Sequence, residues 1–277
     1  MKKIQMVDLK SQYNFIKKEV ADNMLQVFES SNFINGPMVK AFQADMESYL
    51  NVKHVIPCAN GTDALQIALM VFKLDPGDEV ITSDFTFAAT AEVISLLKLK
   101  PVLVDVDPQT FNIDPKAVEK AITSKTKAII PVHLFGQCAA MDSILELAKK
   151  HDLFVLEDNA QAIGATHTFA NGKVAKTGTL GNVGATSFFP SKNLGAYGDG
   201  GAILTNDDEL AHFIRAIVNH GMYKRYYHDV VGVNSRLDAL QASVLKVKLQ
   251  YLDFYNERRK EAAIRYSDYF KNHQNLV

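Results

Sequence analysis

Residues 55–156 alternate between short apolar runs and stretches with helical spacing, and this alternation constrains the fold more than any other feature of the sequence. The apolar runs are rich in Val, Ile and Leu and lie at 55–59, 79–83, 101–106, 128–132 and 153–156. The helical stretches between them cover 61–69, 88–97, 115–122 and 141–149. Apolar strands separated by helices are typical of a parallel sheet covered on both faces. We therefore predict an α/β fold with a mostly parallel sheet sandwiched by helices.

The segments on either side of this alternation extend the predicted domain and begin a second one. Apolar spacing predicts helices over 20–30 and 39–50, as packing helices or an N-terminal arm. Towards the other end we predict a strand at 201–205, a helix at 207–218, a loop at 226–238 and a long helical stretch at 237–269, broken at most once. We therefore expect a large domain with its N-terminal arm over 1–240. A helical connector and an incomplete smaller C-terminal domain would occupy 241–277.

Charge and cysteine content exclude several classes of partner. Thirty basic and 31 acidic residues give a net charge of -1, so neither nucleic acid nor a membrane surface is an expected partner. Cys58 and Cys138 match no metal-ligand spacing and are interpreted as free thiols in a reducing cytoplasm. The N-terminus lacks the apolar core of a signal peptide, and no apolar run reaches membrane-spanning length. We expect a cytoplasmic protein with no metal.

Residues that follow the predicted strands are the candidates for a functional site, because such sheets bind ligands outside the carboxyl ends of their strands. These residues lie at 60–62, 84–87, 133–136 and 157–161, together with Ser187 and Lys192. They would bring an anion cradle, aromatic rings, a histidine, carboxylates and a lysine amine to one edge of the sheet.

Lys192 is the strongest of these candidates, because it lies among aromatic and small residues with no other charge nearby. Desolvation lowers the pKa of a lysine amine, and buried lysines recur as Schiff-base nucleophiles. Asp158 could keep a pyridine nitrogen protonated, and the helix that begins at Gly61 and Thr62 could bind a phosphate through its N–H groups. These three needs are those of pyridoxal phosphate.

Two further side chains suit the same cofactor. Phe87 could stack on its ring, and Gln161 could hydrogen-bond its phenolic oxygen. Each candidate also has a plainer interpretation on its own: Asp158 as a helix N-cap, Phe87 as a core residue, His133 as a hydrogen-bonded polar group, Lys192 as a strand end that reaches water, and 60–62 as an ordinary helix cap. Taken together, the residues are harder to explain as packing.

The sequence resembles the DegT/DnrJ/StrS sugar aminotransferases, which belong to the fold type I pyridoxal phosphate enzymes. The resemblance covers essentially the whole chain. It rests on ordered segments at 60–65, 76–81, 85–87, 131–137, 157–161, 187–192 and 234–238.

This resemblance implies a role for each candidate residue. Lys192 would bind the cofactor aldehyde and then act as the base in the proton shift. The cofactor would be held by Gly61, Thr62, Phe87, Asp158, Gln161, Ser187 and, from a second subunit, Asn234. His133 and Arg236 would bind substrate, with Arg236 meeting an acidic group of the amino donor or of the sugar. A homodimer with a shared active site is therefore expected.

The activity that the resemblance implies is transfer of nitrogen from glutamate to a keto group of a nucleotide-linked sugar, with pyridoxamine phosphate as the intermediate form of the cofactor. The segments 58–66, 186–192 and 231–236 look most similar to WbpE-type enzymes. Those enzymes aminate the 3-keto position of a UDP-linked N-acetylated hexuronic acid for surface polysaccharide such as O-antigen. Family chains usually continue well past Val277, so we expect part of the small domain and of the substrate pocket to be missing.

Other functions compete with this interpretation. A dTDP-keto-deoxysugar could be the acceptor, or the chain could bind pyridoxal phosphate in a regulatory role without turnover. The family's sugar dehydratases carry His in place of the lysine, so Lys192 argues against that activity. A nicotinamide dehydrogenase would need a Gly-x-Gly-x-x-Gly turn after a strand, and the sequence has none.

Overall fold

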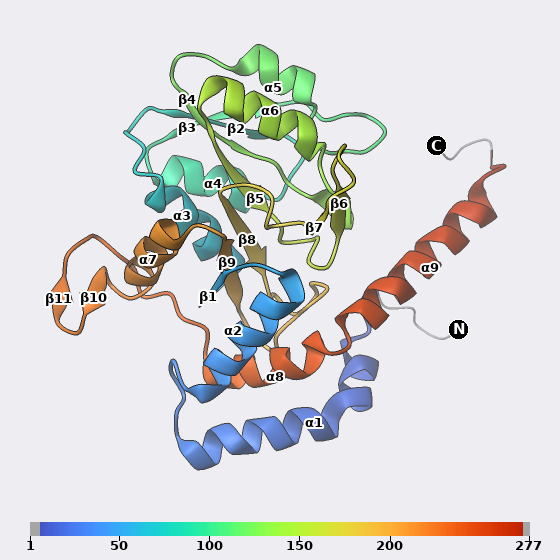
Figure 1. Cartoon of the computed structure of the whole chain (residues 1–277). Helices are drawn as coiled ribbons and strands as arrows, with labels where there is room; N and C mark the ends of the chain where they lie inside the picture. Colours follow the sequence, from blue (N-terminus) through green and yellow to red (C-terminus); the bar gives the residue numbers. More distant parts are fainter. Residues whose placement is uncertain (1–5, 274–277) are drawn as a thin grey trace.

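A seven-stranded sheet forms the centre of the molecule (Figure 1) in the computed structural model, which describes residues 6–273. The strand order is β1-β9-β8-β5-β4-β2-β3. The strands are β1 (His54–Cys58), β2 (Glu79–Ser83), β3 (Lys100–Val104), β4 (Thr126–Ile130), β5 (Phe154–Asp158), β8 (Val183–Ser187) and β9 (Gly201–Thr205). Strand β9 is antiparallel to both of its neighbours, and the other strands all run in one direction. The predicted mostly parallel sheet is confirmed.

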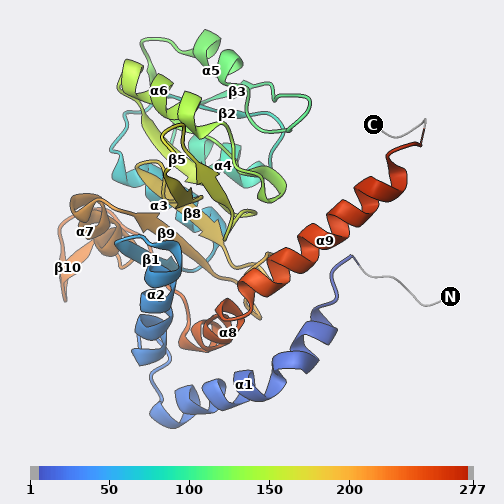
Figure 2. The same ribbon diagram turned by 45° about the vertical axis from the view of Figure 1, so that its right-hand side comes forward.

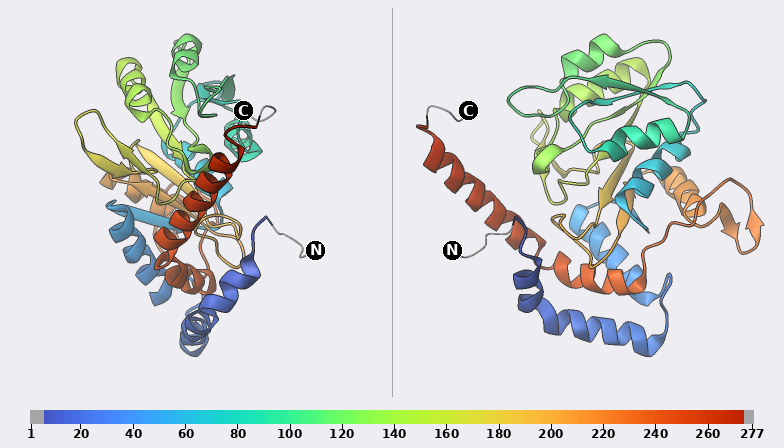
Figure 3. Two further views of the ribbon diagram at one scale, coloured as in Figure 1. Left: turned by 90° about the vertical axis from the view of Figure 1, so that its right-hand side faces the viewer. Right: turned by 180° about the vertical axis from the view of Figure 1, so that it is seen from behind.

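Helices cover both faces of this sheet, as predicted (Figure 3). One face packs against α3 (Gly61–Val71), α4 (Ala88–Leu96) and α7 (Asp208–Ile217). The other face packs against α2 (Pro37–Leu50), α5 (Pro115–Ala121), α6 (Met141–His151) and α8 (Ala239–Leu249). Successive strand side chains point to opposite faces. Accordingly Ile130 and Leu156 lie in the first core, whereas Ile129 and Val155 lie in the second.

The N-terminal helix α1 (Leu9–Ser30) starts well before the predicted position at residue 20. Its cap explains the difference, because the carboxylate of Asp8 accepts the N–H of Ser11 at 3.0 Å. Helix α1 lies along α8, and Ile16 and Val20 pack there with Val244 and Val247. The helix is therefore packed against α8 rather than free.

The long helical stretch near the C-terminus is broken once, as predicted. Helix α8 ends at Leu249, and α9 (Leu252–Phe270) begins after two residues and leads away from the body of the molecule (Figure 2). Buried residues on both sides of the predicted boundary at 240/241, such as Leu237, Ala242 and Leu245, pack in one cluster. The division into a large and a small domain stays a prediction.

Short elements outside the main sheet include two hairpins and one turn of 3-10 helix. These elements are β6 (Thr166–Thr168), β7 (Val174–Lys176), β10 (Met222–Lys224), β11 (Tyr227–His228) and η1 (Leu134–Gly136). Strand β11 falls inside the predicted loop at 226–238, so that prediction was wrong for these two residues. Over residues 6–273, no helix is both long enough and apolar enough to span a bilayer.

Candidate active site

A cavity of about 500 Å³ lies at the carboxyl ends of the central strands. Seven of the predicted site residues line it: Gly61, Thr62, Phe87, Asp158, Gln161, Ser187 and Lys192. Ser187 lies at the end of β8. The fold therefore brings together the lysine, the acid, the aromatic ring and the helix N-terminus that the sequence placed on separate strands.

Lys192 lies in the loop between β8 and β9 and is partly buried. Burial lowers the pKa of its amine, and the nearby Asp158 carboxylate partly offsets this by favouring the charged form. Side chains from distant parts of the sequence hold the loop: Lys248 donates to the Gly195 carbonyl at 2.5 Å, and Asn193 donates to Asn256 at 2.6 Å. The lysine therefore has a lowered pKa and sits on a supported loop, which suits an amine that acts as a nucleophile.

Asp158 ends β5 and is 5% exposed. Its Oδ2 accepts the hydroxyl of Thr90 at 2.8 Å, and its Oδ1 accepts the N–H of Ala160 at 3.1 Å. Burial raises the pKa of Asp158 above its ordinary value, while these two hydrogen bonds and the charge of Lys192 act in the opposite direction. Asp158 is therefore a buried acid that lines the cavity, and it is not the helix N-cap that it could also have been.

The start of α3 approaches the end of β8 very closely. Asn60 caps the helix by accepting the N–H of Asp63 at 2.8 Å. The N–H groups of Gly61 and Thr62 precede the first intrahelical hydrogen bonds, so they are available to an anion. A Cβ on Gly61 would lie 2.6 Å from the Cβ of Ser187, so only glycine fits there. The start of α3 is therefore both capped by Asn60 and able to bind an anion through the N–H groups of Gly61 and Thr62.

Gln161 and Phe87 complete the walls of the cavity. The side-chain oxygen of Gln161 accepts the N–H of Phe135 at 2.8 Å, which leaves its NH₂ group to donate elsewhere. Phe135 itself has a left-handed φ of 56°, a conformation that is costly for a bulky residue and tends to occur at functional sites. Phe87 is 71% exposed and lines the cavity, so it is no core residue.

His133 does not line the cavity, and its prediction as a substrate-binding residue was wrong. The side chain is completely buried, and both ring nitrogens are engaged. Nδ1 accepts the N–H of Ala139 at 3.1 Å, so Nε2 carries the proton that is donated to Glu157 at 2.8 Å. The plainer interpretation, a hydrogen-bonded buried polar group, is the correct one.

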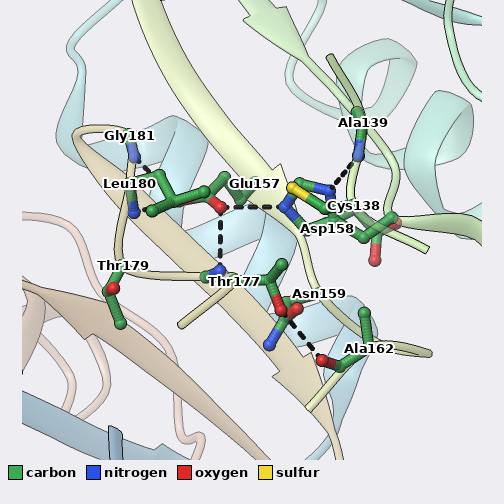
Figure 4. A network of polar contacts seen from close by, with 12 residues as sticks. Cys138, Ala139, Glu157, Asp158, Asn159, Ala162, Thr177, Thr179, Leu180 and Gly181 are labelled. Carbon is green, nitrogen blue, oxygen red and sulfur yellow. Dashed lines mark hydrogen bonds and ion pairs between the residues drawn. The ribbon is translucent and has the colours of Figure 1, made fainter. Parts of the chain in front are cut away.

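Glu157 forms the centre of this buried network beside the cavity (Figure 4). Besides His133, its carboxylate accepts the N–H groups of Gly178 at 2.8 Å, Leu180 at 2.6 Å and Gly181 at 2.7 Å. Glu157 precedes Asp158 on β5, so their side chains point to opposite faces of the sheet. The network therefore anchors the strand from the face opposite to the cavity.

Asn234 and Arg236 do not line the cavity of their own chain. The residue between them, Ser235, is fully buried and holds their segment to the start of α3. Its hydroxyl donates to Asp63 at 2.6 Å and accepts the N–H of Ala59 at 3.0 Å. Asn234 is exposed. Its role toward the cofactor of a second subunit, and the substrate contact of Arg236, stay predictions.

Sequence reasoning missed three residues that support the site: Thr90, Lys248 and Asn256. Thr90 lies three residues after Phe87 in the first turn of α4, and that spacing could have indicated it. Lys248 and Asn256 reach the Lys192 loop from 53 and 63 residues away. No local pattern signals such contacts.

The chemistry of the cavity fits pyridoxal phosphate, since it offers an amine, a buried acid, a stacking ring and free N–H groups at a helix start.

Among residues 6–273, no group of three or more His, Cys, Asp or Glu side chains could hold a metal ion. Both cysteines are free thiols, with Cys58 buried.

Comparison with known proteins identifies the family. Residues 14–277 match the model of the DegT/DnrJ/EryC1/StrS aminotransferase family. This chain belongs to that family. A "UDP-2-acetamido-2-deoxy-3-oxo-D-glucuronate aminotransferase" from Pseudomonas aeruginosa is 49% identical over 263 residues, which cover 95% of this chain and 72% of the relative. A "Pleiotropic regulatory protein" from Geobacillus stearothermophilus is 53% identical over 264 residues, which cover 95% of this chain and 70% of the relative.

A solved structure agrees with these sequence matches. The crystal structure of a Bacillus subtilis protein with bound cofactor PMP (pyridoxamine phosphate) has a TM-score of 0.91 and 33% identity, and the match covers 99% of this chain and 62% of that one. The predicted family, fold class, aminotransferase activity and pyridoxal phosphate cofactor are therefore confirmed.

Proposed function

We propose that this aminotransferase moves an amino group from L-glutamate to the 3-keto position of a UDP-linked N-acetylated hexuronic acid, for surface polysaccharide. The P. aeruginosa relative supports this choice of acceptor. A dTDP-linked keto-deoxysugar is the alternative acceptor. A regulatory protein that binds pyridoxal phosphate without turnover is the alternative function, and the G. stearothermophilus "Pleiotropic regulatory protein" supports it.

The observation that carries the proposal is the pairing of Lys192 with Asp158 in one cavity. Burial lowers the pKa of the amine and raises the pKa of the acid, and each charge partly offsets the effect of burial on the other. Two titratable groups with perturbed pKa values in one cavity are typical of a catalytic pair. A purely structural ion pair would not need the free helix N-terminus and the exposed aromatic ring beside it.

When bound, pyridoxal phosphate supplies an aldehyde for the amine and a ring that accepts electrons. Lys192 would bind the aldehyde and, once released, would move the proton between carbon atoms. Asp158 would hold the ring nitrogen in its protonated form. The remaining contacts would come from Phe87 to the ring face, Gln161 to the phenolic oxygen, and Gly61, Thr62 and Ser187 to the phosphate.

We also propose a homodimer in which Asn234 of one subunit completes the phosphate site of the other. The support is placement: Asn234 is exposed and lies outside its own cavity, on a segment that Ser235 fixes rigidly. Arg236 on the same segment would then face an acidic group of the donor or the sugar. A partner subunit would bring both side chains to a cavity that they do not reach in their own chain.

The test is visible absorbance of the purified chain with added pyridoxal phosphate, followed by L-glutamate. We expect a band from lysine-bound cofactor that disappears on addition of glutamate and returns with the keto sugar. Lys192→Ala should lack the band yet unfold at the same temperature as the wild type. UDP-linked and dTDP-linked keto sugars, compared side by side, identify the acceptor. A band that glutamate leaves unchanged would favour the regulatory alternative.

A further inference from the structure

A second cavity, of about 570 Å³, lies next to the first. We propose that Arg259 and the hydroxyl of Tyr255 form an oxyanion-binding subsite in it, for a carboxylate or diphosphate group of a substrate. This inference rests on the proposed function, because it treats the second cavity as an extension of the aminotransferase site. Substrates of that function carry either a carboxylate, as in glutamate, or a diphosphate, as in a nucleotide sugar.

The two cavities meet at the lysine loop. Ser191 and Lys192 line both of them. The other walls of the second cavity come from the start of α1 and from α9, including Arg259 and Tyr255. A substrate that places its reacting group near Lys192 can therefore extend into the second cavity. Its charged end would then reach α9.

The Arg259 guanidinium and the Tyr255 hydroxyl lack hydrogen-bond and ion-pair partners in the described part of the chain, unlike their neighbour Arg258. Among residues 6–273, Arg259 forms no ion pair or hydrogen bond, and the Tyr255 hydroxyl is buried without a hydrogen-bond partner. In contrast, Arg258 pairs with Glu261 at 2.7 Å. A buried hydroxyl without a partner costs free energy, so such groups in folded proteins usually meet a ligand or an ordered water. Here the hydroxyl and a free guanidinium lie one helical turn apart.

The charges around the cavity favour an anion. Lys248 is buried and donates to the Gly195 carbonyl, and no described carboxylate pairs with it. Burial and then the positive charge of Arg259 lower the pKa of Lys248 to about 8, so Arg259 adds to an already positive region. Among the residues that line the cavity, three cations, Lys192, Arg258 and Arg259, outnumber one carboxylate, that of Asp8, which caps α1. An incoming oxyanion would balance this positive charge.

The position of Arg259 is well defined because α9 is fastened to the lysine loop one turn earlier. Asn256 accepts from Asn193 at 2.6 Å and donates to the Ile163 carbonyl at 3.1 Å. Residues 255, 256 and 259 are separated by the i, i+3 and i, i+4 spacing that places side chains on neighbouring parts of one helix surface. The Asn256 contacts therefore keep Arg259 and Tyr255 on the side of α9 that faces Lys192.

The test measures binding by isothermal titration calorimetry in the wild type, Arg259→Met, Arg259→Lys and Tyr255→Phe. The probes are UDP, for a diphosphate, and L-glutamate, for a carboxylate. Lys260→Met is the matched control, because Lys260 is the next residue on α9, carries the same charge and lies outside the cavity. Thermal unfolding checks that each variant folds. UDP binding needs no pyridoxal phosphate, so this readout is independent of turnover.

We expect Arg259→Met to weaken one probe by about tenfold to a hundredfold, because hydrogen bonds to charged groups contribute about 1.5–3 kcal/mol. Arg259→Lys should retain part of the affinity, and Tyr255→Phe should lose less than Arg259→Met. Weaker UDP binding alone assigns the subsite to the nucleotide, and weaker glutamate binding alone assigns it to the donor. If Arg259→Met binds both probes like Lys260→Met, the subsite is refuted. If the wild type with added pyridoxal phosphate forms no lysine-bound absorbance band, the proposed function is refuted instead.

Discussion

Replacing Glu157 with Gln tests the buried network that anchors β5 behind the cavity. The carboxylate accepts four hydrogen bonds, two on each oxygen: Leu180 and Gly181 donate to Oε1, and Gly178 and His133 donate to Oε2. The amide of Gln has one oxygen, so its NH₂ group must face two N–H donors in either orientation. At about 1.5–3 kcal/mol for each hydrogen bond to a charged group, the loss of two predicts a decrease of about 3–6 kcal/mol in the free energy of unfolding.

The assay is urea unfolding of the cofactor-free chain, followed by circular dichroism at neutral pH. Glu146→Gln is the matched control, because Glu146 is exposed on α6 and should change stability by less than about 0.5 kcal/mol. A loss below about 1 kcal/mol for Glu157→Gln would refute the argument, because it would mean that the amide finds acceptors which the structure does not contain.

Three further predictions concern the support of the cavity. The pKa of Lys248 falls from 10.5 to about 8 on folding, so between these pH values the folded state binds fewer protons than the unfolded state. The free energy of unfolding should therefore rise by about 3 kcal/mol from pH 8 to 10.5. A series of urea unfolding curves should show this rise in the wild type and not in Lys248→Met. Gly61→Ala should destabilise the chain by about 1–3 kcal/mol in the same assay, because the new Cβ would lie 2.6 Å from the Cβ of Ser187. Unchanged stability would mean that α3 can shift to make room for the methyl group. Thr90→Val removes a hydrogen-bond donor from Asp158 and should raise the pKa of that acid further. The pH dependence of the absorbance of bound cofactor measures this shift. Thr90→Ser keeps the hydroxyl and is the control.

Much of this site could be predicted because it depends on the ends of strands. Apolar runs and turn residues locate strand ends, and parallel strands bring those ends to one edge of the sheet. Lys192, Asp158 and Gly61 were therefore placed together correctly from the sequence. The predicted strand boundaries differ from the observed ones by one or two residues, as at β4, which ends at Ile130 rather than at the predicted residue 132.

The failures have a different physical origin. His133 follows a strand, as site residues do, but its side chain turns inward to Glu157, and strand position alone does not determine that direction. The start of α1 at Leu9 was missed because the first turns of the helix, capped by Asp8, bury Ile16 and Val20 against α8, which lies more than 200 residues away in the sequence. Contacts of this kind depend on tertiary packing, which local spacing does not encode.

The lysine loop shows how far the site depends on such packing. Two side chains from later helices hold the loop just after Lys192: Lys248 on α8 donates to the Gly195 carbonyl, and Asn256 on α9 accepts from Asn193. Lys248 is buried without a carboxylate partner among residues 6–273, which is costly unless its hydrogen bond to Gly195 is maintained. That cost makes movement of the loop away from α8 unfavourable, because movement would leave a buried amine with no acceptor. The helices after residue 240 therefore help to place Lys192, and both parts of the predicted division at 240/241 support the cavity.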